Sequence, residues 1–259
     1  MSRRRSEILA EMGLAPVWRL RKGATGAEPP SVPEEHAARS SSPPPPSARR
    51  TQGAARAAAA TPSMVVDPRE EQILRMDWAA LTAKVAGCTD CRLRATCKQT
   101  VFGVGDERAA WMLVGEAPGA EEDRLGEPFV GQAGKLLDNM LAAIGLKRGE
   151  NVYVANVLKC RPPGNRNPEP DEVARCSPYL ARQIELIGPK LVVAMGRFAA
   201  QTLLHTDATI ASLRGSVHRY AGVPLIVTYH PAYLLRSLPD KAKAWADLRF
   251  AVKTLQGLS

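Results

Sequence analysis

The spacing of the cysteines gives the most direct indication of chemistry. Cys88 and Cys91 form a C-x-x-C pair, 68 residues separate Cys91 from Cys160, and 15 separate Cys160 from Cys176. Four thiolates can ligate either zinc or a four-iron cluster, and spacing alone does not distinguish the two. Because four ligands leave no open coordination position, a structural role is expected. Cys97 lies outside this pattern.

Polar and aromatic residues near the ends of apolar runs are candidates for ligand contact. Asn156 interrupts an apolar run, and its amide suits the edge of a nucleic-acid base, although a satisfied core amide is the alternative. His230 follows another run and is held by Pro231, which can aim its imidazole at a ligand. Phe129 lies between a loop and a helical stretch, where a plain core position is the common alternative.

A tight turn follows the first apolar run. It reads Gly115-Glu116-Ala117-Pro118-Gly119, with Glu122 close behind. Two glycines around a proline let backbone N–H groups approach a ligand closely, although a purely structural turn would have the same composition.

Basic residues accompany two of these segments. Arg161 and Arg166 flank an irregular stretch after Asn156, where phosphate contact is plausible. Leu234 and Arg236 follow His230, and an aliphatic side chain beside a basic one is suited to wedging into a duplex.

The elements that must position these residues alternate between strand and helix. Apolar runs at 109–114, 152–158, 191–195 and 223–228 predict strands, and helical periodicity predicts helices at 135–144, 171–187, 197–204 and 241–255. One further helix is expected from Asp67-Pro68 to Gly87. The alternation predicts an α/β fold, a three-layer α/β/α sandwich around a short, mostly parallel four-stranded sheet. Ligands of such sheets bind beyond the carboxyl ends of the strands.

Composition divides the chain into a tail and one domain. Residues 1–66 are rich in Pro, Ala and Ser, which predicts a disordered tail with a possible short helix within 6–20 and a partner that the sequence does not identify. Residues 67–259 form the predicted folded domain.

Charge and hydropathy narrow the class of protein. The net charge of +9 and the pI near 9.6 suit a polyanionic partner such as nucleic acid. No run reaches the roughly 18 to 20 apolar residues of a membrane-spanning helix, and no apolar signal-peptide core follows the basic start. We therefore expect a cytoplasmic protein without a membrane partner, in which reduced cysteines serve as ligands rather than disulfides.

These motifs together resemble the iron-sulfur, or type 4, uracil-DNA glycosylases. The resemblance rests on the GEAPG loop at 115–119, KCRPP at 159–163, HPAYLLR at 230–236 and the four spaced cysteines. It runs from about Cys88 to Leu255, and the tail before Asp67 has no counterpart. It implies a DNA-repair enzyme that flips uracil out of single- or double-stranded DNA and hydrolyses its N-glycosidic bond. No lysine is evident as a Schiff-base nucleophile, so a monofunctional enzyme that leaves an abasic site is expected. We also expect the enzyme to be a monomer.

The resemblance also implies roles for individual residues. Phe129 would stack on the extruded uracil, Asn156 would bind its polar edge, and His230 would donate to uracil O2. Glu122 would crowd the C5 position and exclude thymine. A [4Fe-4S] cluster is implied on Cys88, Cys91, Cys160 and Cys176, with zinc as the lesser alternative. The Gly115–Gly119 loop, including Glu116 and Ala117, would form the site of the sugar and the water. Leu234 would act as a wedge, and phosphate contacts would come from Arg161, Arg166 and Arg236.

One departure concerns the water-activating base. Relatives in the wider superfamily carry an aspartate where this chain has Ala117, so no general base is obvious, and Glu116, Glu122 or a backbone-held water are the options.

Two alternative functions also stay open. One is an iron-sulfur or zinc DNA-binding module without glycosylase activity, and the other is a related glycosylase that also accepts hypoxanthine or ethenocytosine.

Overall fold

The structure, a computed structural model, describes residues 67–258. The predicted tail and its possible short helix lie outside the described residues. Within the described part, no helix is both long enough and apolar enough to cross a membrane.

A six-stranded mixed sheet forms the centre of the domain, in the order β1-β3-β2-β4-β6-β5. The four inner strands are parallel, which confirms the prediction of a mostly parallel sheet. Short antiparallel strands add one edge on each side, and sequence periodicity missed them because they contain only 2 and 3 residues. The strands are β1 Val104–Gly105, β2 Trp111–Gly115, β3 Val152–Asn156, β4 Leu191–Met195, β5 His218–Tyr220 and β6 Val223–Thr228.

Helices connect the strands close to the predicted positions, and short turns of helix were not predicted. The α-helices are α2 Pro68–Leu74, α3 Trp78–Ala86, α4 Ala120–Leu125, α5 Gln132–Ala143, α6 Pro170–Ile187, α7 Arg197–Leu204, α8 Ile210–Leu213, α9 Pro231–Leu234 and α10 Lys241–Gln256. Short 3-10 helices lie at Arg92–Ala95, Pro163–Asn165 and Leu238–Asp240.

The single helix predicted over residues 67–87 is wrong, because the chain forms two helices there. Helix α2 ends at Leu74, and α3 begins at Trp78. The side chain of Asp77 accepts a hydrogen bond from the Ala80 N–H at 2.8 Å, and this cap starts a new helix. The apolar residues kept helical spacing across the break, so periodicity did not reveal it.

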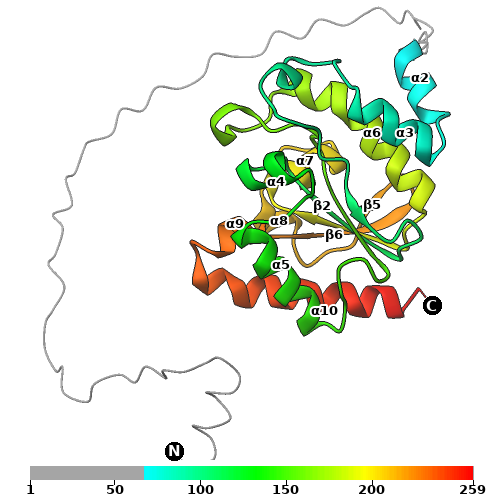
Figure 1. The fold of residues 1–259 in the computed structure, drawn as a ribbon. Helices are drawn as coiled ribbons and strands as arrows, with labels where there is room; N and C mark the ends of the chain where they lie inside the picture. Colours follow the sequence, from blue (N-terminus) through cyan, green and yellow to red (C-terminus); the bar gives the residue numbers. More distant parts are fainter. Residues whose placement is uncertain (1–66, 259) are drawn as a thin grey trace, which may run out of the picture. The chain divides into compact units, whose positions relative to one another are not determined.

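Alternating side chains of the strands pack against two separate helical layers. In β2, Met112 and Val114 join a cluster with residues of α3, α6 and α7, whereas Trp111 and Leu113 join a cluster with residues of α5 and α10. Figure 1 shows α10 and α5 on the opposite side of the sheet from α3 and α6. Each buried aliphatic side chain contributes roughly 1.5–3 kcal/mol through removal of apolar surface from water. The predicted three-layer α/β/α sandwich is therefore confirmed.

The carboxyl ends of the inner strands lie next to one another. Gly115 at the end of β2 is paired with Asn156 at the end of β3, and Met195 of β4 is paired with Thr228 of β6. This register brings the four following loops to one edge of the sheet, where a ligand site is expected.

Candidate functional site

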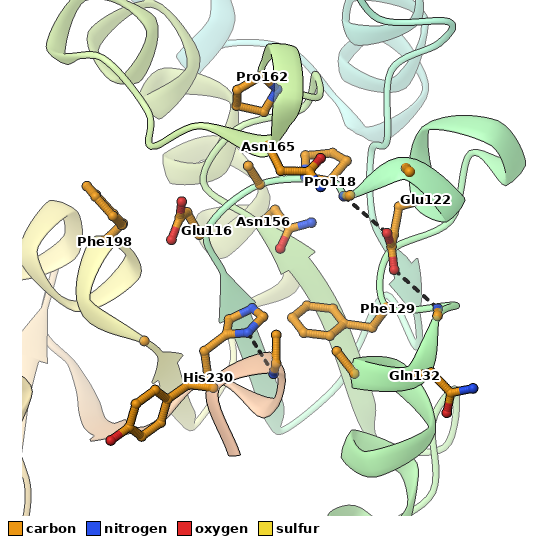
Figure 2. Close-up of a pocket in the computed structure, with 18 of the residues that line it drawn as sticks. Glu116, Pro118, Glu122, Phe129, Gln132, Asn156, Pro162, Asn165, Phe198 and His230 are labelled. Atoms are coloured by element: carbon orange, nitrogen blue, oxygen red, sulfur yellow. Dashed lines mark hydrogen bonds between the residues drawn. The ribbon is translucent and has the colours of Figure 1, made fainter. Parts of the chain in front are cut away.

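A pocket of about 800 Å³ lies at the carboxyl edge of the sheet, lined by the loops that follow β2, β3, β4 and β6. Figure 2 shows its lining side chains. The sequence-predicted residues that line it are Glu116, Ala117, Gly119, Glu122, Phe129, Asn156, Arg166, His230 and Arg236. Gly115, Arg161 and Leu234 do not belong to the lining, and the four cysteines lie around a different cavity.

Phe129 and His230 form one wall of the pocket. Their ring centroids are 5.3 Å apart, with an angle of 29° between the ring planes. Phe129 has a backbone φ of 55°, which is uncommon for a bulky residue and requires support from its surroundings. Arg148 supplies that support, because it donates to the carbonyl oxygens of Pro128 at 2.8 Å and Phe129 at 3.0 Å.

Asn156 presents an unused hydrogen-bond acceptor beside these rings. It is 2% exposed, and its Oδ1 is the one buried side-chain N or O atom within residues 67–258 that lacks a partner. A Cβ atom on Gly115 would lie 2.4 Å from this Oδ1 and 2.6 Å from Cζ of Phe129, so only glycine fits there. Leaving a buried polar atom unpaired costs roughly 1–3 kcal/mol, and a ligand N–H would recover that cost.

The hydrogen bonding of His230 determines its tautomer. Nδ1 accepts a hydrogen bond from the Ala232 N–H at 3.1 Å, so the proton of the neutral ring lies on Nε2. Burial, with a smaller contribution from the positive charge of Arg236, lowers the pKa of His230 to about 4, although Glu122 opposes the shift. The imidazole is therefore a neutral hydrogen-bond donor at physiological pH.

Two carboxylates of the pocket have different environments. Glu122 accepts hydrogen bonds from the N–H groups of Gly119 at 3.1 Å, Val130 at 3.1 Å and Gly131 at 3.3 Å, so it bridges two loops. The side chain of Glu116 has no hydrogen-bond partner among the described residues. Burial raises the pKa of Glu116 to about 7, although Arg197 opposes that shift. Glu116 is therefore the carboxylate that is free to accept a proton.

The loop after β6 departs from the predicted wedge. Leu234 is 1% exposed, because it lies in α9, which packs against α5. Its neighbour Leu235 is 43% exposed. An aliphatic side chain that enters a duplex must be accessible, so the structure favours Leu235 over Leu234 for that role. Arg236 is exposed and lines the pocket.

The arginines after β3 are partly committed to protein partners. Arg166 donates to both carboxylate oxygens of Glu172, at 2.9 and 2.5 Å, so its guanidinium is paired within the protein although it lines the pocket. Arg161 donates only through Nε, to Asn165 at 2.7 Å, and its terminal nitrogens are free of hydrogen bonds within the described part.

Four cysteines line a second, small cavity. Cys88, Cys91, Cys160 and Cys176 surround it, whereas Cys97 is buried outside its lining. Burial raises the pKa of the Cys176 thiol to about 12, and it also raises the pKa of Cys160. Within residues 67–258, no group of three or more His, Cys, Asp or Glu side chains is arranged to hold a metal ion as it stands. The donor set of four thiols around one cavity nevertheless fits the chemistry of a tetrathiolate centre.

A hydrogen-bond network closes the outer side of this cysteine cavity. The Asp90 carboxylate accepts from Tyr179 at 2.6 Å, from Arg69 at 2.7 and 2.9 Å, and from the Cys88 thiol at 3.4 Å. These contacts hold the pKa of Asp90 at about 2. The network fastens α2 and α6 around the thiols.

Several pocket residues were not found in the sequence. Gly196 follows β4 with a φ of 93°, and a Cβ there would lie 3.0 Å from Cβ of His230. Its place directly after a predicted strand was the signal that could have identified it. The other unpredicted lining residues include Gln132, Asn165, Arg197, Phe198 and Tyr229.

Comparison with known proteins gives a consistent family. The chain matches the uracil DNA glycosylase superfamily over residues 102–249. It is 48% identical over 163 residues to the type-4 uracil-DNA glycosylase of Archaeoglobus fulgidus, which covers 60% of this chain and 81% of that protein. It is 43% identical over 181 residues to the type-4 uracil-DNA glycosylase of Pyrobaculum aerophilum, covering 67% of this chain and 92% of that protein. The type-5 uracil-DNA glycosylase of P. aerophilum is 35% identical over 148 residues, covering 50% of this chain and 64% of that protein.

Proposed function

Because this chain belongs to the uracil DNA glycosylase superfamily, we propose that its pocket excises uracil from DNA as a step of DNA repair. The observation that carries the proposal is the convergence of Phe129, Asn156 and His230 on one pocket, with the Asn156 Oδ1 unpaired. A base within a duplex is inaccessible, so the enzyme must first extrude the nucleotide into the pocket.

The rings and the amide suit recognition of uracil. In the proposed complex, the extruded base stacks on Phe129, and the Asn156 Oδ1 accepts the uracil N3–H. Cytosine has an acceptor at its N3, so it would leave the Asn156 oxygen unpaired in the amide orientation that accepts the uracil N3–H. Glu122 lines the same pocket. We propose that it excludes the 5-methyl group of thymine in addition to bridging the two loops.

His230 suits the departure of the base. When the C1′–N1 bond breaks, its electron pair moves to the uracil ring, and negative charge develops on O2. The Nε2–H of neutral His230 is proposed to donate to O2 and to keep its proton throughout. A fixed donor aimed at developing charge supplies differential stabilisation of the transition state.

Water completes the hydrolysis. The water oxygen bonds to C1′ and its proton passes to the Glu116 carboxylate. The products are an abasic sugar and a uracil anion, which becomes free uracil by taking a proton from solvent. The unpaired side chain of Glu116 and its pKa of about 7 support this role. Gly115, Ala117 and Gly119 belong to the same loop, which is proposed to enclose the sugar and the water.

For the cysteine cavity, we propose a [4Fe-4S] cluster held by Cys88, Cys91, Cys160 and Cys176. Zinc is the second candidate, because both accept four thiolates. When bound, the cluster would link the segment after α3 to the segment after β3 and to α6, and no step of the hydrolysis passes through it. Iron quantification and an absorption band near 400 nm in freshly purified protein would distinguish iron from zinc.

The surface beside the pocket is proposed to bind the DNA strand that contains uracil, single- or double-stranded. Arg161 and Arg236 are available for phosphates, and Leu235 is available as the wedge. We propose that the enzyme acts as a monomer, since one chain contains every residue named in the mechanism.

Single-turnover release of uracil from a labelled oligonucleotide tests the proposal. We expect His230→Ala to slow release by about a hundredfold to a thousandfold, because one donor to the leaving group is lost. DNA binding and folding of that variant should persist. A wild-type protein that binds DNA but releases no uracil would instead indicate the DNA-binding module. Faster release of hypoxanthine or ethenocytosine in competition assays would indicate the broader glycosylase.

A further inference from the structure

A lysine is buried between the cysteine cavity and the end of β3. Lys159 is 2% exposed, follows Asn156 by three residues and directly precedes Cys160. It also lines the cysteine cavity. Burial of a charged group is costly unless partners compensate for the lost water, so the contacts of this ammonium group indicate what it stabilises.

The Lys159 side chain has two partners, and neither is a carboxylate. Its Nζ donates to the backbone carbonyl of Asn156 at 2.9 Å and to Oε1 of Gln183 at 2.6 Å. Gln183 lies in α6 and in turn donates to the Phe102 carbonyl at 3.0 Å. Within residues 67–258, Lys159 forms no ion pair with Asp or Glu.

The Lys159 backbone is connected to the cysteine site. Its N–H donates to Sγ of Cys176 at 3.2 Å, and its carbonyl accepts from the Val101 N–H at 2.7 Å. One residue therefore contacts a thiol through its main chain and the carbonyl of Asn156 through its side chain.

Asn156 depends on its backbone for orientation. Its side-chain amide makes no hydrogen bond within the described residues, and its Oδ1 is unpaired. The amide lies close to Gly115, where an added Cβ would be 2.4 Å from its Oδ1. The carbonyl held by Lys159 is therefore a polar contact through which the rest of the protein can fix this residue.

We propose that Lys159 is a positioning residue, whose ammonium group holds the Asn156 carbonyl to α6 and the cysteine-bearing segment so that the Asn156 amide faces the bound base. The inference rests on the proposed function, since Asn156 must contact a base for its orientation to matter. If the four cysteines bind the proposed cluster as thiolates, a cation beside them would also be favourable electrostatically.

The test compares Lys159→Met with Lys190→Met in the full-length, cluster-loaded chain. Lys190 is exposed at the amino end of β4, away from the pocket, and its substitution removes the same charge. We expect Lys159→Met to slow single-turnover uracil release by about tenfold to a hundredfold at unchanged iron content, because small displacements of a positioning group carry such costs. Lys190→Met should keep the wild-type rate.

A double-mutant cycle with Asn156→Ala separates positioning from general damage. If Lys159 acts through Asn156, Lys159→Met should add less than about twofold in the Asn156→Ala background. Equal losses in both backgrounds would overturn the proposal, as would a wild-type rate for Lys159→Met. A wild-type chain that releases no uracil would contradict the proposed function itself and is recognised before any variant is compared.

Binding supplies a readout that does not need turnover. An oligonucleotide with 2′-fluoro-2′-deoxyuridine resists cleavage, and the matched thymidine oligonucleotide measures contact with DNA alone. Lys159→Met should weaken binding of the first by about tenfold and leave binding of the second unchanged. Equal weakening of both would show a merely structural effect and overturn the proposal.

Gln183→Met keeps the test decisive if Lys159→Met does not fold. It removes one acceptor of the ammonium group and leaves Lys159 beside the thiols. We expect uracil release to fall by about threefold to tenfold with full iron content, and the loss to disappear in the Asn156→Ala background. An undiminished rate for Gln183→Met would then overturn the proposal.

Discussion

The pocket and the cysteine cavity differ in whether their polar side chains have hydrogen-bond partners. In the pocket, the Asn156 oxygen and the Glu116 carboxylate have no partners within the described chain. Around the cysteines, the Asp90 carboxylate accepts hydrogen bonds from Arg69, Tyr179 and Cys88. Two groups proposed to contact the substrate are thus left unpaired, whereas Asp90, which links α2 to α6, has three partners. Unpaired buried groups are thus the better guide to chemistry in this fold.

The largest effect is expected from substitution of a cysteine that lines the cysteine cavity. Cys176→Ser is expected to abolish the cluster and to lower the free energy of unfolding by about 4 kcal/mol or more, as loss of a metal centre does. Denaturant unfolding together with iron content measures it. An iron-free variant with wild-type stability would show that the cavity does not hold the domain together.

A smaller loss is expected when the pocket is filled. Gly115→Ala places a Cβ against the Asn156 oxygen and the Phe129 ring. We expect uracil release to fall by about a hundredfold, because the Asn156 amide and the Phe129 ring must move, while iron content stays at the wild-type level. Single-turnover assays measure the rate. An unchanged rate would mean that neither side chain needs its present position.

The pH dependence of the rate distinguishes Glu116 from His230. With a pKa of about 7, Glu116 loses its basic form as pH falls, so the rate at pH 6 should be about tenfold below its plateau above pH 8. His230, with a pKa of about 4, stays neutral over this range. Glu116→Gln should be slow and should remove the dependence near pH 7. If the rate of Glu116→Gln still depended on pH near 7, that dependence would belong to another group.

The smallest effect on catalysis is expected at the surface of the pocket. Leu235→Ala should slow release from duplex DNA by about tenfold or less and leave single-stranded DNA unaffected, because only a duplex has a stack to fill. Leu234→Ala should instead destabilise the fold by about 2–5 kcal/mol, as buried leucine truncations do. Parallel duplex and single-strand assays, with thermal unfolding, compare the two. The reverse pattern would restore Leu234 as the wedge.

The sequence predicted the inner sheet and the major helices, because long apolar runs report burial directly. It also singled out Phe129, Asn156 and His230 as candidate ligand contacts, and the structure brings them to one pocket. It did not separate Leu234 from Leu235, because exposure within one helical turn depends on tertiary packing.

Other features depend on side-chain contacts that no local pattern encodes. Arg166 is paired with Glu172, and Glu122 is engaged by backbone groups of a separate loop. The break between α2 and α3 is a local exception, since the capping residue Asp77 was visible in the sequence but the periodicity across it was uninterrupted.

The bridge made by Glu122 has a further consequence for how the pocket receives a nucleotide. Three N–H groups from two loops converge on one carboxylate, so the wall beside Phe129 is already assembled in the free protein. Ordering of loops normally consumes part of the affinity of a complex. In this pocket the loops are ordered when the protein folds, so ordering them does not reduce the free energy of DNA binding. More of that binding free energy is then available to offset unstacking of the extruded base.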